Sequence, residues 1–236
     1  MRIISVRRGF ASDHSSTSYE FLAVDRQLTK AERAEVSKLS SRANVTARRA
    51  DFVYNVDGYD IPGGWDSLMA RYYDVMYSES YDWWTLAMAF NAEPGKYEEL
   101  CQYEFSGVDD LGVYISKDEH RVIVTISCRI DMRMAHGYND YYNDEDDGDE
   151  CEESDAGAGG MVVVTDDDLL DLLVKIRKQI IDGDYRTLYA VWEMYGASED
   201  EDDENEDEED KPPPKPEDTK AGKETINEFK RYLDSY

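Results

Sequence analysis

Residues 111–130 read LGVYISKDEHRVIVTISCRI, and this stretch decides the fold class. Its two arms, residues 111–115 and 121–130, are rich in Val and Ile and are joined by a charged turn around Asp118. The second arm alternates apolar and polar residues, which is the pattern of a strand with one buried face. The stretch therefore predicts an antiparallel β-hairpin.

The flanking sequence predicts more strands and several short helices. Strands are expected at residues 1–10, 19–24, 51–56, 72–77 and 83–90, and helices at 28–43, 65–71 and 97–103. Thr29 followed by Glu32 is a capping box, which predicts where the first helix begins. The fold class expected is α+β, with a mostly antiparallel sheet and short helices, followed by a C-terminal helical hairpin.

That helical hairpin is expected over residues 161–197. Thr165 is a candidate N-cap, and apolar residues recur at helical spacing from Leu169 to Ile180. Gly183 suits the left-handed position that ends a helix, and Asp184 is expected to cap the second helix. The predicted organisation is an α+β domain at 1–131, an acidic flexible linker at 132–160, the hairpin, a disordered acidic and proline-rich segment at 198–221, and a short helix at 222–236.

The acidity of the chain is concentrated in two tracts. The formal net charge is -28, from 54 acids and 26 Lys and Arg. Residues 144–155 hold nine acids and residues 199–210 hold eleven, with no base in either. Such runs in a linker solvate the chain, because they lack the fixed spacing of phosphates on a duplex. Charge therefore describes the linkers more than the folded part.

Several classes of protein are excluded or disfavoured. No apolar run is long enough for a transmembrane helix, and the N-terminus becomes charged too early for a signal peptide. Three widely spaced cysteines suit a reducing cytoplasm. The three histidines have no partner at metal-ligand spacing, so neither a metal nor a cofactor is expected.

The loop before the second strand is the candidate for catalysis. The candidate residues are Asp13, His14, Ser15, Ser16 and Ser18. Hydroxyls beside an imidazole suit a nucleophile and its base, or a phosphate site. Asp13 is a poor orienter of His14, because neighbouring residues on a strand point to opposite faces. A polar loop that satisfies its own backbone is the favoured interpretation.

Two other groups of residues are candidates for binding a macromolecule. Aromatic residues suit a protein interface, and the candidates are Trp83, Trp84, Tyr189, Trp192 and Tyr195. Basic residues near the N-terminus suit nucleic acid, and the candidates are Arg7, Arg8, Arg48 and Arg49. The overall negative field opposes phosphate binding, so a protein partner is favoured.

Several segments resemble a family of bacterial proteins that has no assigned activity. The matching segments are Y-E-F-L-A at residues 19–23, L-S-S-R-A at 39–43, and G-D-x-R-x-L-Y at 183–189. Relatives often have Asn-Trp-Gly where this chain has Tyr-Asp-Trp-Trp at 81–84. The resemblance implies a bacterial cytoplasmic origin and no particular chemistry.

Together these features lead to one favoured function and two alternatives. The favoured function is a non-catalytic adaptor or regulatory subunit that binds another protein, with no membrane partner. The first alternative is an enzyme or a phosphate-binding or nucleotide-binding protein that uses the loop at residues 14–18. The second is a nucleic-acid-associated protein that uses the basic N-terminal stretch.

Overall fold

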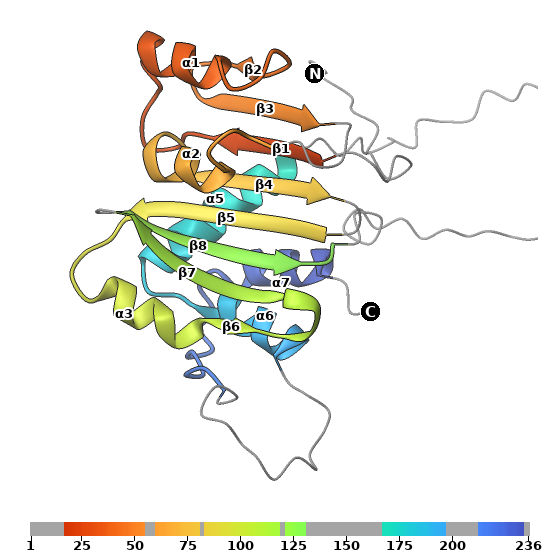
Figure 1. Cartoon of the computed structure of the whole chain (residues 1–236). Helices are drawn as coiled ribbons and strands as arrows, with labels where there is room; N and C mark the ends of the chain where they lie inside the picture. Colours follow the sequence, from red (N-terminus) through yellow and green to blue (C-terminus); the bar gives the residue numbers. More distant parts are fainter. Residues whose placement is uncertain are drawn as a thin grey trace, which may run out of the picture.

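The computed structural model describes residues 17–54, 60–80, 83–118, 121–130, 167–196 and 212–233. Within these residues, eight strands form one sheet in the order β2-β3-β1-β4-β5-β8-β7-β6 (Figure 1). Every neighbouring pair is antiparallel, which confirms the predicted α+β fold. The strands are β1 Thr17–Leu22, β2 Asn44–Val45, β3 Arg49–Tyr54, β4 Val75–Ser80, β5 Trp83–Asn91, β6 Phe105–Ser106, β7 Gly112–Asp118 and β8 Arg121–Cys128.

The predicted hairpin is present. β7 and β8 pair with Gly112 opposite Ser127 and Asp118 opposite Arg121. β8 is also paired with β5 along its whole length, so the hairpin lies inside the sheet. Val122, Val124, Ile126 and Cys128 are all buried, as their alternation predicts.

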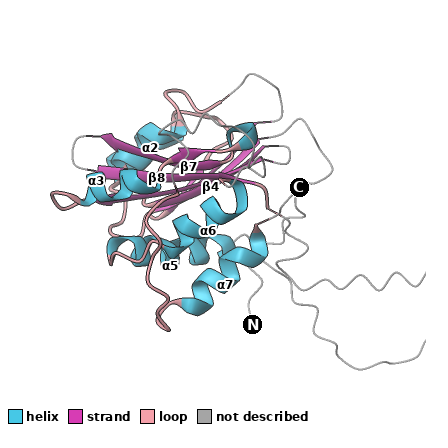
Figure 2. Cartoon of the chain, turned by 90° about the horizontal axis from the view of Figure 1, so that it is seen from below, coloured by secondary structure: helices cyan, strands magenta, loops and turns pink. Residues whose placement is uncertain are grey.

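Helices cover both faces of the sheet. They are α1 Lys30–Ser37, α2 Trp65–Arg71, α3 Lys96–Leu100, α5 Asp167–Ile181, α6 Arg186–Tyr195 and α7 Lys223–Tyr232, with short 3-10 turns η1 Cys101–Tyr103 and η2 Val108–Asp110. Figure 2 shows α5, α6 and α7 below the sheet and α2 above it. We call these two sides the α5 face and the α2 face.

β5 shows how one strand serves two cores. Leu86, Met88 and Phe90 point to the α5 face and pack in the larger cluster of buried residues. Ala87 and Ala89 point to the α2 face and belong to the second cluster, which includes residues of α1 and α2. The alanines are small, so they leave room for α2 to pack closely on the strand. The α5 face holds the larger residues. The helical hairpin of α5 and α6 therefore packs against the main core of the sheet.

The α5–α6 connection confirms one sequence prediction and corrects another. Gly183 has a φ of 88°, and its N–H donates to Ile180 O while Asp184 N–H donates to Gln179 O. These two bonds close a Schellman motif. Asp184 was expected to cap α6, but the N-cap position is one residue later, at Tyr185, which makes no side-chain capping bond. The Asp184 carboxylate nevertheless accepts from the N–H of Arg186, the first residue of α6, at 3.3 Å, and from its guanidinium at 2.7 and 2.8 Å.

The first helix is shorter than the sequence pattern indicates. The capping box of Thr29 and Glu32 is present, but α1 ends at Ser37 rather than at residue 43. Lys38 N–H donates to Glu35 O and the Ser40 hydroxyl accepts from Arg42 N–H. Local bonds of this kind compete with a continuing helix, which explains the early end.

Some predicted segments lie outside the described residues. They are the strand at residues 1–10, the acidic linker at 132–160, and the acidic part of the segment at 198–221. Residues 212–221 of that segment are described, and Pro213 is buried there. None of the described helices has the length and apolar character needed to cross a bilayer.

Candidate functional site

A buried ionic cluster lies where β1, β4, β5 and β8 meet α5. Asp74 stands just before β4 and is 4% exposed. Its Oδ2 accepts hydrogen bonds from the backbone N–H groups of Val24 and Asp25, at 2.7 and 2.9 Å. These two residues follow β1, so the carboxylate fixes the turn that leads from β1 to α1.

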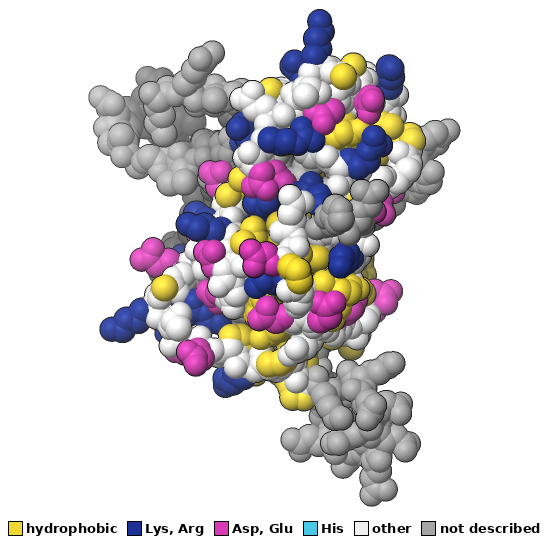
Figure 3. Space-filling model, turned by 90° about the vertical axis from the view of Figure 1, so that its left-hand side faces the viewer, with side chains coloured by type: hydrophobic (Ala, Val, Ile, Leu, Met, Phe, Trp, Pro, Cys, Tyr) yellow, Lys and Arg dark blue, Asp and Glu magenta, His cyan; other side chains and the backbone are white. Residues whose placement is uncertain are grey.

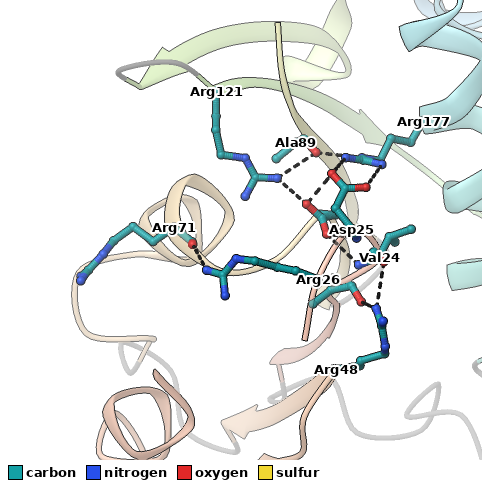
Figure 4. Close-up of polar contacts among 10 residues, drawn as sticks. Val24, Asp25, Arg26, Arg48, Arg71, Ala89, Arg121 and Arg177 are labelled. Atoms are coloured by element: carbon teal, nitrogen blue, oxygen red, sulfur yellow. Dashed lines mark hydrogen bonds and ion pairs between the residues drawn. The ribbon is translucent and has the colours of Figure 1, made fainter. Parts of the chain in front are cut away.

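Two arginines satisfy the rest of this cluster (Figure 4). Arg121 of β8 donates to Asp74 Oδ1 at 2.5 Å, and Arg177 of α5 lies 3.7 Å from the same oxygen. Both guanidinium groups also donate to the carbonyl of Ala89, at 3.0 and 2.8 Å. Arg177 completes the arrangement with a bidentate pair to Asp25 at 3.0 and 2.5 Å. We call Asp25, Asp74, Arg121 and Arg177 the Asp74 cluster.

The Asp74 cluster stabilises the contact between α5 and the sheet. Two carboxylates face two guanidinium groups, and the buried oxygens of Asp74 already accept bonds from the protein itself. Arg177 belongs to α5 and its partners belong to the sheet and the β1–α1 turn, so the cluster attaches α5 to this end of the sheet. Breaking a buried pair of this kind is strongly destabilising, because it leaves an uncompensated charge.

Basic side chains gather at the neighbouring end of the molecule. Figure 3 shows Lys and Arg over the α1–β2–β3 end, above a mixed surface. Arg48 donates to the carbonyls of Ala23 and Val24 at 2.9 and 2.8 Å. Arg26 donates to both oxygens of Glu32, and this bond is the main reason that the pKa of Glu32 falls to about 2. Bonds within the protein therefore use some of the guanidinium N–H donors at this end of the molecule.

The sequence candidates for nucleic acid are only partly described. Arg49 begins β3 and Arg48 precedes it, so both lie at this basic end. Arg7 and Arg8 lie outside the described residues. The structure therefore shows only two of the four arginines that this hypothesis needs on one face.

The candidate catalytic loop is also mostly outside the described residues. Asp13, His14, Ser15 and Ser16 fall in that part of the chain, while Ser18 lies in β1 and is buried. Ser18 is paired opposite Val53 of β3 and Glu79 of β4, so its backbone lies in the interior of the sheet. Among the described residues, no group of three His, Cys, Asp or Glu is placed to hold a metal ion.

The aromatic candidates separate into buried and half-buried residues. Trp84 and Tyr195 are 6% and 7% exposed and pack in the main core, so a partner cannot reach them in this conformation. Trp83 is half-buried, with the guanidinium of Arg129 5.3 Å from its ring centroid. The other two aromatic candidates belong to α6 and are half-buried, and one of them, Tyr189, also packs against the main core.

Those two residues are Tyr189 and Trp192. They lie one turn apart on α6, and their ring centroids are 5.5 Å apart with an interplanar angle of 41°. A Cβ at Gly196 would clash with the indole of Trp192, so the ring folds back over the end of the helix. The indole thus lies between a tyrosine ring and glycine backbone, which restricts its orientation.

A turn with unusual backbone lies beside the end of α6. Asp109 and Asp110 have φ of 57° and 58°, a region that ordinary residues rarely adopt. The turn carries Val108, whose side chain is 68% exposed. A Cβ at Gly107 would clash with the carbonyl oxygen of Tyr195, so the turn contacts α6 closely.

Hydrogen bonds hold this turn in place. Gly107 N–H donates to Leu111 O at 2.7 Å, and the Tyr114 hydroxyl donates to Asp110 O at 2.8 Å. Backbone outliers that the surrounding structure over-determines are concentrated at functional sites. We call Tyr189 and Trp192 the α6 patch.

Sequence reasoning missed the Asp74 cluster and Val108. Arg177 was a usable signal, because it interrupts the apolar stripe between Leu173 and Ile180 and a buried charge needs a partner. The identity of that partner could not be read locally, since Asp25 lies 152 positions away. Val108 gave no periodic signal, because its exposure comes from the backbone of a turn.

Neither a scan of family models nor a search of curated proteins found a match to this chain.

Proposed function

We propose that this protein is a non-catalytic, cytoplasmic adaptor or regulatory subunit of bacterial origin that binds another protein through the α6 patch. The observation that supports it is the tilted ring contact between Tyr189 and Trp192, both of which are left half-buried on α6. Tyr and Trp are the residues most enriched in binding hot spots. Restricted rings also lose little conformational entropy when a partner binds.

The dimensions of the α6 patch favour a small and reversible interface. Among the described residues, the large hydrophobic residues that are exposed are Val108, at 68%, and Ile181, at 39%. Obligate interfaces are large and strongly hydrophobic, whereas transient signalling contacts are small. The proposed partner therefore binds and leaves, with the two rings as anchors and polar residues around them.

The Asp74 cluster supports the same proposal because its charged groups are bonded within the protein and do not face a substrate. Its charged groups are satisfied by one another and by backbone groups, so its contribution is to stability. A site for catalysis or phosphate binding would need groups that turn toward a substrate. In the α6 patch, by contrast, Tyr189 and Trp192 keep part of their side chains accessible.

The proposal is tested by comparing matched variants in affinity capture from cells that produce the chain naturally. We expect the double variant Tyr189→Ala, Trp192→Ala to recover at least about tenfold less of each specific partner, which is the loss typical of hot-spot residues. Lys178→Ala, on the exposed side of α5, is the matched control and should recover wild-type amounts. Equal recovery by the double variant would reject the α6 patch as the binding surface.

Trp83→Ala in the same experiment separates the other accessible candidate. Its indole already contacts Arg129, so we expect recovery within about twofold of wild type. A large loss with Trp83→Ala and none with the double variant would move the interface to the start of β5.

A further inference from the structure

α7 is an amphipathic helix that packs in the groove between α5 and α6. Its apolar residues recur at positions i, i+3, i+6 and i+7 and are all buried; they are Ile226, Phe229, Tyr232 and Leu233. Figure 2 shows α7 on the side of α5 and α6 that faces away from the sheet. This geometry is that of a helical peptide bound in a hydrophobic groove.

Charged pairs lie along both edges of the groove. Lys175 of α5 pairs with Glu228 at 3.2 Å, and Glu193 of α6 pairs with Lys230 at 3.0 Å. All four side chains are between 38% and 53% exposed. Exposed pairs contribute little affinity, so the apolar residues supply most of the binding and the charges set the orientation.

The α5–α6 turn binds the backbone that precedes α7. Arg186 donates to the carbonyls of Thr219 and Ala221, and Gln179 donates to the carbonyl of Gly222 at 3.0 Å. Gly222 has a φ of 70°, and a Cβ there would clash with the amide of Gln179. The groove therefore recognises Gly-x3-Ile-x2-Phe-x2-Tyr-Leu, which is a short helical motif.

Residues 196–222 join α6 to α7, and they include the tract of eleven acids. A helix of ten residues is too short to be stable alone in water, so α7 acquires its fold from the groove.

We infer that the α5–α6 groove is a binding site for an amphipathic helix of a partner protein, and that α7 occupies it in cis. A partner helix with the spacing of the α7 motif displaces α7, while edge charges matching Glu228 and Lys230 set its direction. The inference rests on the contacts of α7 and not on the α6 patch, so it holds even if the α6 patch binds nothing.

The test uses the full chain with a specific protease site placed within residues 199–210. The probe is a fluorescent peptide of residues 212–236, and its binding is followed by anisotropy before and after cleavage. We expect the cleaved protein to bind the peptide about 100-fold more tightly or better, because cleavage removes the tether. A peptide with Phe229→Ala should not bind, while Glu224→Gln, at an exposed position, should bind like the natural sequence.

Equal binding before and after cleavage, or cleaved protein that never exchanges its own fragment for the probe, would overturn the inference. The Phe229→Ala variant of the intact chain provides a second test. Its α7 should leave the groove without cleavage, so this variant should bind the natural peptide as the cleaved protein does. A stable dimer of the intact chain that takes up no peptide would assign the groove to a second copy, and would also overturn it.

Discussion

The Asp74 cluster and the α6 patch are attached to the same sheet but use their side chains in opposite ways. In the Asp74 cluster, Asp74, Arg121 and Arg177 are largely buried and are bonded to one another, to the Ala89 carbonyl and to the more exposed Asp25. In the α6 patch, two aromatic side chains stay partly exposed to solvent. The first arrangement stabilises the fold, and the second is available to a partner.

The largest expected effect is on the Asp74 side of this comparison. Asp74→Ala leaves Arg121 and Arg177 without their shared carboxylate and two backbone N–H groups without an acceptor. We expect a loss of about 3–5 kcal/mol in the free energy of unfolding, measured by urea titration. Asp182→Ala, at an exposed position beyond α5, is the control. If the two variants unfold at the same urea concentration, the Asp74 cluster does not stabilise the fold as described.

Gly196→Ala tests the second region of the comparison, the α6 patch. The new methyl group would occupy the space of the Trp192 indole, so the ring must move away from Tyr189. We expect a shift of the Trp192 indole N–H resonance and at least about a fivefold loss of partner recovery, with stability changed by less than about 1 kcal/mol. An unchanged indole resonance would show that Gly196 does not determine the ring position.

The backbone of the turn at Asp109 and Asp110 predicts that a substitution there can increase stability. Asp110 has a φ of 58°, which glycine adopts without steric cost, and only its backbone carbonyl is bonded to Tyr114. In Asp110→Gly, glycine removes the backbone strain but gives the unfolded chain more conformational freedom. We therefore expect a net gain of about 0.5–1 kcal/mol in the free energy of unfolding, measured by thermal unfolding. A loss of stability would mean that the aspartate side chain supports the turn.

How much could be predicted from the sequence depended on how local the cause was. The β7–β8 hairpin and α2 follow from alternation and short-range signals, and both agree with the structure. The Asp74 cluster joins residues from both ends of the chain, so no local pattern reveals its partners. Trp83 and Trp84 are adjacent and of the same residue type, so composition does not distinguish them. They face opposite sides of the sheet, and as a result Trp84 is buried while Trp83 is half-buried.

The smallest expected effect concerns pH. The guanidinium of Arg186 is the main cause that lowers the pKa of Asp184 in the folded protein. A lowered folded pKa contributes stability above the unfolded value of about 3.9, and this contribution is lost as pH falls through the folded pKa. Asp184→Asn should lose roughly 0.5 kcal/mol at pH 7 and show a weaker decline below about pH 4. Identical pH profiles for the two proteins would contradict this assignment.

The central claim is that a partner contacts the α6 patch, and site-specific photocross-linking tests it most directly. A benzophenone amino acid replaces Tyr189 in one protein and Tyr97, a half-buried residue of α3, in the control. After illumination in the native cells, the account predicts a discrete adduct from position 189 that disappears when Trp192→Ala is added, and none from position 97. No adduct at position 189, or equal adducts at both positions, would contradict it.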